Sequence, residues 1–313
     1  MKNFLGRYKK YILTGTILLY AIMAVLLFYY GELSITGTVF ALLPAIAAGI
    51  WIMRNYKFTR KVFQCKIDGT TMDIVDIYPL KFWQEPRQRA IRHRYGISSI
   101  IPLDNKPHGE LYLKGISALI PLYFDTRSPE QALILGVAGG AIPRYLLTLY
   151  PECRATGVEL SRETIEIMSP YFLNDLPADR FTLVNADAAD FVAGSDEKQE
   201  KYDFILCDIF SGSDPVTTVY SENFFRHISA ILAPGGFVAM NLQFINPHKL
   251  TELLQAAGKH LGYVELFTSN AKCFVIAGNT EDRERMLKLA KRFRYYREMA
   301  WILDFPVYSI TGQ

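Results

Sequence analysis

Residues 132–160 read ALILGVAGGAIPRYLLTLYPECRATGVEL, and this stretch decides the fold. It begins with a short apolar run at 132–136, passes through a turn of small residues into a helical pattern at 141–150, and ends in a second strand pattern at 155–160. Small residues in the turn let a ligand approach the backbone closely, and the following helix points its amino terminus at the same place. The stretch therefore predicts a strand–turn–helix–strand unit with a ligand site at the turn.

The same alternation of strand and helix patterns continues along the chain. Further strand patterns lie at 181–186, 202–210 and 237–242, and helical patterns run from Ser161 to about Phe172, near 221–232 and at 247–260. The last two apolar runs, 264–268 and 273–278, are joined by a short Ser-Asn turn that predicts an antiparallel hairpin. Alternation of this kind predicts an α/β domain with a mainly parallel sheet covered on both faces.

Acidic residues stand at the ends of three of these strands. Glu159 closes the second strand, 23 residues after Gly136, while Asp187 follows the third strand and Asp208 the fourth. Ligands of open α/β sheets bind outside the carboxyl ends of the strands, and an acid at the position of Glu159 typically accepts hydrogen bonds from ribose hydroxyls. A dinucleotide dehydrogenase is disfavoured because the turn lacks GxGxxG spacing, and a P-loop is excluded because no GK[ST] follows it. An adenosyl ligand without a pyrophosphate fits this pattern better.

Two long uncharged stretches precede this domain. Residues 11–30 and 33–53 each have the roughly 20 apolar positions that a helix needs to cross a bilayer, and Gly31-Glu32 between them favours a tight turn. Basic residues lie before the first stretch and after the second, so the positive-inside rule predicts that both ends face the cytoplasm. We therefore expect a two-helix transmembrane hairpin in the inner (cytoplasmic) membrane, with the lipid bilayer as a partner and the catalytic domain in the cytoplasm. A cleaved signal peptide is the alternative for the first stretch, but the second stretch disfavours it.

The pattern along the chain predicts three regions. They are the transmembrane hairpin at 1–55, a small β-rich region at 56–125, and the α/β domain at 126–313. Within the β-rich region, 62–67 and 72–77 flank Asp68-Gly69 as a hairpin, and 89–101 adds one more strand. A helix is expected at 109–124, and a basic amphipathic helix at 281–300.

Composition narrows the classes of function. The formal net charge is +3, but residues 1–61 hold eight basic residues and one acid, so the folded remainder carries an excess of four negative charges. A nucleic-acid-binding domain carries its basic excess on the folded part, so no nucleic-acid partner is expected. The four cysteines form no CxxC pair, and no metal site is predicted.

The ordered motifs ALILGVAGGAIPRYL, GVELS, NADAADF, YDFILCDIFSGSDP, NFFRHISAILAPGGFVAMNL and KCFVIAG resemble the spermidine synthase (polyamine aminopropyltransferase) family. They look most like its bacterial membrane-associated type, in which the glycine turn continues into a Pro-Arg pair, here Pro143-Arg144. The resemblance covers about residues 130–280. It implies a Rossmann-like S-adenosylmethionine methyltransferase fold and transfer of an aminopropyl group from decarboxylated S-adenosylmethionine to a small-molecule amine.

The resemblance also assigns roles to individual residues. It implies that the donor is cradled by four small residues of the turn, Gly136, Ala138, Gly139 and Gly140. Glu159 would hold the ribose hydroxyls, Asp187 would accept from the adenine amino group, and Asp208 would hold and deprotonate the attacking amine. Such a base is needed because an alkyl amine has a pKa near 10 and is mostly a non-nucleophilic ammonium at pH 7.

Departures from the family pattern keep two alternatives open. The glycine turn has no acid to receive the ammonium of the donor, and the motif that follows Asp208 is stretched before Asp214-Pro215. One alternative is an S-adenosylmethionine-dependent methyltransferase on the same fold. The other is a non-catalytic sensor of an adenosyl ligand. The fold also allows a homodimer.

Overall fold

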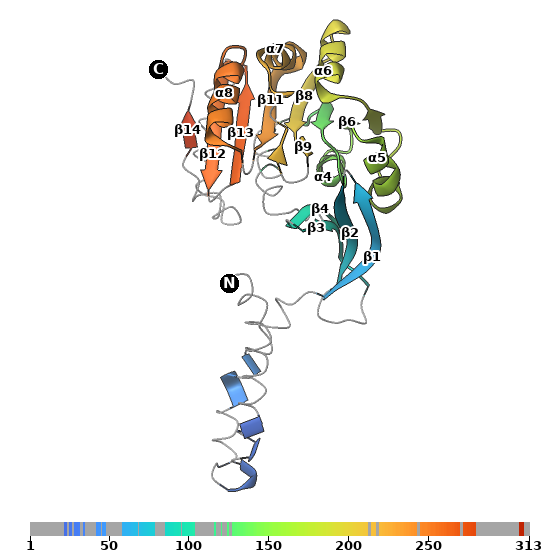
Figure 1. Ribbon diagram of the computed structural model, residues 1–313, viewed down its shortest axis with the longest axis vertical. Coiled ribbons are helices and arrows are strands. Elements are labelled where there is room, and N and C mark those ends of the chain that lie inside the picture. Colours follow the sequence, from blue (N-terminus) through green and yellow to red (C-terminus); the bar gives the residue numbers. More distant parts are fainter. Residues whose placement is uncertain are drawn as a thin grey trace. The chain divides into compact units, whose positions relative to one another are not determined.

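The protein is described here by a computed structural model, shown in Figure 1. The structure describes residues 58–103 except 68, 79–84 and 95, residues 127–269 except 212–213, 217–218 and 243–244, residues 272–279 and 307–309, and isolated positions between 22 and 47 and at 116, 120 and 124. The chain forms two compact units: Met1–Thr59 with Ile77–Pro86, and Arg60–Asp76 with Arg87–Gln313.

The first unit contains the two apolar stretches, and most of their residues lie outside the described part of the chain. The described positions at 22–29 and 42–47 are helical, and a turn at Tyr30–Gly31, where Gly31 has φ +77°, lies between them. Several of these helical residues expose large apolar side chains, among them Ile22, Leu26 and Ile46. Among the described residues, no helix combines the length and the apolar character that crossing a bilayer requires.

A small antiparallel sheet precedes the α/β region. Its strands are β1 (Phe58–Ile67), β2 (Thr70–Tyr78), β3 (Gln88–His93) and β4 (Gly96–Pro102), in that order. The hairpin expected around Asp68-Gly69 is confirmed as β1–β2. The single strand expected at 89–101 is wrong: the segment folds into the hairpin β3–β4, because Gly96 at φ +143° turns the chain before Ile97. The predicted helices at 109–124 and 281–300 lie outside the described residues, apart from positions 116, 120 and 124.

The described strands of the α/β region form an eight-stranded sheet in the order β14-β12-β13-β11-β8-β5-β6-β7 (Figure 1). Its parallel part contains β5 (Gln131–Leu135), β6 (Arg154–Glu159), β7 (Phe181–Asn185), β8 (Tyr202–Cys207) and β11 (Leu232–Asn241). The antiparallel part contains β13 (Lys272–Gly278), β12 (Tyr263–Ser269) and β14 (Val307–Ser309). The predicted α/β class and the β12–β13 hairpin are confirmed. The edge strand β14 is an addition that the sequence patterns did not indicate.

Both faces of the parallel strands are buried, as their continuous apolar runs require. Along β5 and β8, Ile134 and Leu206 belong to one apolar cluster, while Leu133 and Ile205 belong to the other. The first cluster includes residues of α4 (Ala141–Leu149), and the second includes residues of α6 (Ala188–Glu197), α7 (Glu222–Ile231) and α8 (Pro247–Gly258). Because the strands are covered on both faces, a ligand can contact them only at their ends, and the residues at the carboxyl ends are the candidates.

Helix starts follow the chemistry of their cap residues. Ser161 caps α5 (Arg162–Met168) by accepting a hydrogen bond from Thr164 N at 3.1 Å. The helix expected to run to about Phe172 changes at Ser169 into a π-helical turn, η1 (Ser169–Leu173). The sequence patterns did not predict α6, whose large apolar residues are only Phe191 and Val192.

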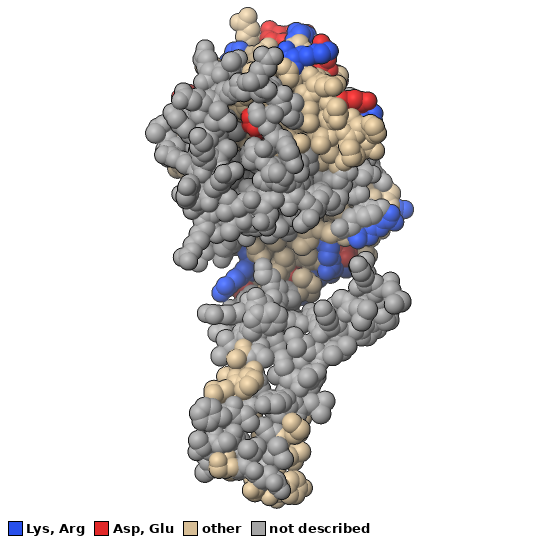
Figure 2. Space-filling view, turned by 90° about the vertical axis from the view of Figure 1, so that its left-hand side faces the viewer, with Lys and Arg blue, Asp and Glu red and all other residues tan. Residues whose placement is uncertain are grey.

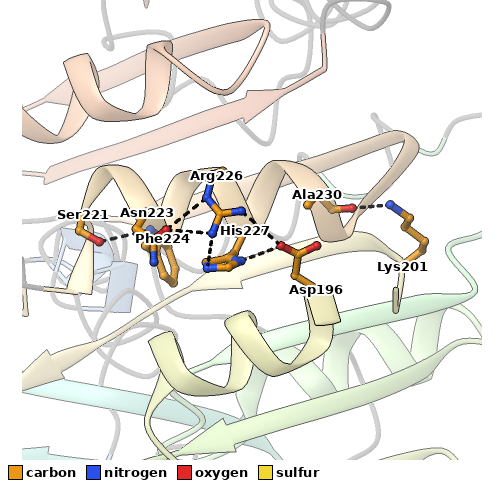
Figure 3. Close-up of polar contacts among 8 residues, drawn as sticks. All are labelled: Asp196, Lys201, Ser221, Asn223, Phe224, Arg226, His227 and Ala230. Carbon is orange, nitrogen blue, oxygen red and sulfur yellow. Dashed lines mark hydrogen bonds and ion pairs between the residues drawn. The ribbon is translucent and has the colours of Figure 1, made fainter. Parts of the chain in front are cut away.

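Polar side chains join α7 to α6 (Figure 3). His227 Nδ1 lies 2.7 Å from Asp196 Oδ2, and His227 Nε2 lies 2.9 Å from a guanidinium nitrogen of Arg226. Arginine only donates, so Nε2 accepts and Nδ1–H donates to the carboxylate. At the two ends of α7, Ser221 accepts from Phe224 N, and Lys201 donates to the carbonyl of Ala230. The contacts hold α7, which begins at Glu222, two residues after Tyr220.

Charged side chains of both signs are interspersed on the described surface (Figure 2). In the small sheet, Lys61 and Arg92 lie 2.8 and 3.3 Å from the carboxylate of Asp73, and Arg89 lies 2.7 Å from Asp76. Lys61, Arg89 and Arg92 are thus paired with acids of the same sheet.

Candidate functional site

The turn between β5 and α4 has a backbone that only small residues tolerate. Gly136, Ala138 and Gly140 have φ values of +88°, +43° and +63°. A Cβ on Gly136 would lie 2.2 Å from the carbonyl oxygen of Asp208, so the end of β8 packs directly against the turn. The structure thereby brings the glycine turn and Asp208 together, as the sequence predicted.

The small sheet contributes a second close approach to the turn. A Cβ on Gly139 would lie 2.5 Å from the hydroxyl oxygen of Ser99, which belongs to β4 and is 3% exposed. Ser98 and Ser99 line one pocket together with Gly136, Ala138 and Asp208. Sequence reasoning attached no function to this serine pair, because the contact joins residues about 40 positions apart. Only its position within the otherwise apolar pattern of β4 could have drawn attention to it.

Glu159 is held against the turn by backbone amides. Its Oε2 accepts from Val137 N at 3.2 Å and from Ala138 N at 3.3 Å, and its Oε1 accepts from Ser161 N at 3.2 Å. Two carboxylate oxygens offer about four lone-pair positions, so capacity for a further donor remains. The carboxylate is therefore oriented at the carboxyl end of β6 and can accept from hydroxyl groups of a ligand.

Asp187 caps the helix that follows β7. Its Oδ1 accepts from Ala189 N at 2.7 Å and from Asp190 N at 3.2 Å, and among the described residues no protein group donates to its Oδ2. Asn185, two residues earlier, donates to the carbonyls of Glu159 and Leu160 at 2.9 and 2.8 Å. Asp187 thus stands next to the end of β6, with one oxygen available to a ligand.

Leu160 is a feature of this edge that sequence reasoning missed. Its side chain is 68% exposed directly after Glu159. A leucine this exposed beside two carboxylates supplies an apolar surface on which a flat ring can pack. The signal in the sequence was a large apolar residue immediately after the last acid of a strand.

Asp208 occupies a different environment at the end of β8. Asn241, which ends β11, donates from Nδ2 to its Oδ1 at 2.7 Å. Removal from bulk water and the negative charge of Glu159 raise the pKa of Asp208 to about 6, against the opposing effect of the Asn241 hydrogen bond. This carboxylate is ionised at neutral pH and close enough to neutrality to take up a proton. Asn241 is a second residue that sequence reasoning missed.

Two further titratable side chains lie near Asp208 and stay uncharged. Burial raises the pKa of the Cys207 thiol, and burial together with the negative charge of Asp208 raises the pKa of Tyr220. The hydroxyl of Tyr220 is buried and has no hydrogen-bond partner among the residues that the structure describes. Asp208 is therefore the group of this trio that can hold a negative charge at neutral pH.

The segment after Asp208 folds back on itself. Residues Phe210–Ser211 (β9) and Asp214–Pro215 (β10) pair antiparallel, with Ser211 opposite Asp214. The stretched motif noted in the sequence is thus a small hairpin next to the site. Among the residues that the structure describes, no group of histidine, cysteine or acidic side chains is arranged to hold a metal ion.

Comparison with known proteins agrees with this geometry. The family model of the spermine/spermidine synthase domain matches residues 117–275, which is half of the chain. The chain belongs to the spermine/spermidine synthase family. Within this family, a polyamine aminopropyltransferase of Vibrio vulnificus is 31% identical over 113 residues, which cover 36% of this chain and 38% of that protein.

A more distant match lies outside the synthases. An eEF1A lysine and N-terminal methyltransferase homolog of Drosophila melanogaster is 29% identical over 132 residues, covering 40% of this chain and 19% of that protein. The chain spans between 32% and 54% of the lengths of the first curated aminopropyltransferases that it matches. The part that the family model matches, residues 117–275, carries the turn and the strand-end acids.

The fold has solved counterparts. The crystal structure of a probable spermidine synthase from Corynebacterium glutamicum superposes with a TM-score of 0.57 at 19% identity, covering 69% of this chain and 79% of that one. This likeness confirms the Rossmann-like, methyltransferase-type α/β fold predicted from the sequence. The roles of individual site residues stay predictions.

Proposed function

We propose that the chain is a transferase that moves an aminopropyl group from decarboxylated S-adenosylmethionine to a small amine. The observation that carries the proposal is the placement of Asp208, a half-buried carboxylate with a pKa near 6, directly against a glycine turn of the synthase family. A carboxylate in that position can both orient an amine and accept its proton.

The donor would lie along the carboxyl edge of the sheet. Glu159, already fixed by three backbone amides, accepts from the ribose hydroxyls, and Asp187 accepts from the adenine amino group through its available Oδ2. Leu160 packs against the adenine ring. The turn from Gly136 to Gly140 leaves room for the rest of the donor, because its residues have little or no side chain. The donor is a co-substrate, and no metal is needed for this chemistry.

Asp208 would act on the acceptor. The ammonium of the amine loses a proton to Asp208. The nitrogen lone pair then attacks the carbon of the aminopropyl group that is bonded to the sulfonium sulfur of the donor. A C–N bond forms while the C–S bond breaks, and its electron pair stays on sulfur, giving methylthioadenosine and the lengthened amine. Because the sulfonium is a good leaving group, most of the rate enhancement comes from holding amine and donor in line.

The test is an assay of the purified full-length chain with each donor and a panel of small amines. Release of methylthioadenosine is expected with the decarboxylated donor. Asp208→Asn should abolish turnover while donor affinity stays within a few-fold, and Asp179→Asn, an exposed aspartate outside the site, is the matched control. Equal losses of donor affinity and rate in Asp208→Asn would contradict the role of Asp208 as base.

A second candidate is methyl transfer from S-adenosylmethionine. It is favoured by the glycine turn, whose Ala138-Gly139-Gly140 offers no carboxylate for the ammonium of an aminopropyl donor, and by the similarity to the Drosophila methyltransferase homolog. The same assay separates the candidates, because methyl transfer releases adenosylhomocysteine. Tight binding of adenosyl compounds without either product would instead indicate a sensor.

We further propose that residues 11–53 anchor the chain in the inner membrane by two spans, with the catalytic domain in the cytoplasm. The two uncharged stretches and the exposed apolar side chains at their described positions support this. Membranes washed with alkaline carbonate should retain the full chain. A fluorescent protein fused to the carboxyl terminus should fluoresce on the cytoplasmic side of the membrane. Release of the chain by carbonate would contradict the anchor.

A further inference from the structure

The contact between Asp208 and Asn241 joins two strand ends that are far apart in sequence. β8 and β11 run parallel, with Cys207 opposite Met240, so the next residue on each strand lies beside its neighbour. Asn241 is 2% exposed, and its Nδ2 lies 2.7 Å from Asp208 Oδ1. An ionised carboxylate only accepts, so the amide nitrogen must face it, and this fixes the orientation of the Asn241 amide.

The other groups around Asp208 either disfavour its ionised form or are uncharged. Glu159 repels it, and burial keeps Cys207 and Tyr220 neutral. Among the described residues, Asn241 is the group that favours the ionised form of Asp208. It does so without adding a charge, so it leaves room for the positive charges of donor and amine.

We propose that Asn241 is the positioning residue of this site, which holds Asp208 Oδ1 so that Oδ2 is the oxygen presented to the acceptor amine. The proposal rests on the proposed function, because it assigns the amine to Asp208. No protein group in the described part of the chain donates to Oδ2. One oxygen is therefore committed to the protein scaffold and the other is left to substrate.

The amide suits this task better than its closest replacements. A carboxylate at position 241 would be within hydrogen-bond distance of Asp208, and two such acids share one proton instead of both ionising. An alanine would remove the donor and let the carboxylate rotate. Asparagine supplies a permanent donor of fixed length, which sets both the direction of Oδ2 and the pH at which Asp208 ionises.

The test compares Asn241→Asp and Asn241→Ala in the purified full-length chain, with Asn223→Ala as control. Asn223 is an exposed asparagine of α7 whose Oδ1 accepts hydrogen bonds from Arg226 (Figure 3). Titration of Asp208 is followed by NMR of carboxyl-labelled aspartate, with Asp208→Asn to assign the signal. In parallel, kcat, KM for the amine and binding of methylthioadenosine are measured across pH.

The midpoint of the Asp208 titration should rise by about one pH unit in Asn241→Ala, and further in Asn241→Asp. That shift alone lowers kcat about twofold at pH 7. A further loss of roughly tenfold should persist at high pH, where Asp208 is ionised in every variant, because the carboxylate is no longer oriented. Binding of methylthioadenosine should stay within a few-fold, and the control should match the wild type.

Two results would overturn the proposal. One is an unchanged Asp208 midpoint in both variants, and the other is full recovery of kcat at high pH. Asn241→Asp keeps the shape of asparagine, so it decides the question if Asn241→Ala fails to fold. If the wild-type chain transfers nothing, the proposed function fails, but the titration still shows whether Asn241 holds Asp208.

Discussion

The two carboxylates at the centre of the site are held in opposite ways. Glu159 is fixed by backbone amides of Val137, Ala138 and Ser161, which lie in the adjoining turns. Asp208 is fixed by one side chain from another strand and is removed from water, which raises its pKa to about 6. Amide-bound acids suit the recognition of a neutral ribose, whereas a desolvated acid near its pKa suits proton transfer. Under the proposed function, the half of the pocket around Glu159 would bind the donor and the half around Asp208 would carry out the chemistry.

Gly136 joins the two halves, so its substitution should have the largest effect. Gly136→Ala places a Cβ 2.2 Å from the backbone oxygen of Asp208 at a φ of +88°. We expect the free energy of unfolding to fall by about 3 kcal/mol or more, because neither backbone segment can easily move to make room for the methyl group. Donor binding should be lost as well. Urea unfolding and calorimetry with methylthioadenosine would measure both losses.

Gly194→Ala is the matched control for this change. A Cβ at Gly194 in α6 meets nothing within 4 Å, and a helical glycine is disfavoured relative to alanine. The control should be neutral or stabilising by up to about 1 kcal/mol. If the two glycine variants behaved alike, the close approach of β8 to the turn would be wrong.

Glu159→Gln tests the binding half, and it changes the chemical half only by removing a negative charge that raises the pKa of Asp208. A glutamine keeps one acceptor oxygen but cannot satisfy the turn amides and a ribose together. Donor affinity should fall about 10- to 100-fold, as expected for losing a hydrogen bond to a charged group. At saturating donor, kcat should change little. A loss confined to kcat would place Glu159 in the chemistry and erase the distinction between the halves.

The sequence predicted the half around Glu159 better than the half around Asp208, because the first depends on contacts between residues close in sequence. Glu159, its distance from Gly136 and the caps of α5 and α7 depend on residues close in sequence, and each could be predicted from local patterns. The partnership of Asp208 with Asn241 and the approach of Ser99 to Gly139 depend on which strands are neighbours. One sequence without relatives does not specify those pairs. The missed helix α6 has only two large apolar residues, Phe191 and Val192, which are adjacent and so show no helical period.

Asp208 should also limit the stability of the fold at neutral pH. Its pKa in the folded chain is near 6, above the roughly 3.9 of an unfolded aspartate, so the folded state binds more protons between these values. Stability from this group is therefore present at low pH and is lost as pH rises from about 4 to 6. Asp208→Asn should abolish turnover yet raise the free energy of unfolding at pH 7.5 by about 1–2 kcal/mol.

The free energy of unfolding of the wild type and of Asp208→Asn, measured between pH 4 and 8, would test this prediction. The stability gain of the variant should shrink toward pH 4, where Asp208 is protonated in the folded chain. A gain that did not change with pH would mean that the charge of Asp208 is not desolvated. The catalytic half would then be no different from the binding half.

The smallest effect is expected from removing the hydroxyl of Tyr220. Tyr202 and Tyr220 are both 5% exposed, but Tyr202 donates to Glu200 at 2.8 Å, while the hydroxyl of Tyr220 has no partner in the described part of the chain. A buried hydroxyl without a partner costs free energy, whereas a bonded one contributes about 1 kcal/mol. Tyr202→Phe should therefore destabilise by about 1 kcal/mol, and Tyr220→Phe should be neutral or stabilising by less than that. Thermal unfolding of the two variants, measured side by side, gives the sign of each change in stability. A clear loss of stability in Tyr220→Phe would mean that its hydroxyl is bonded, and the catalytic half of the pocket would be less desolvated than its geometry indicates.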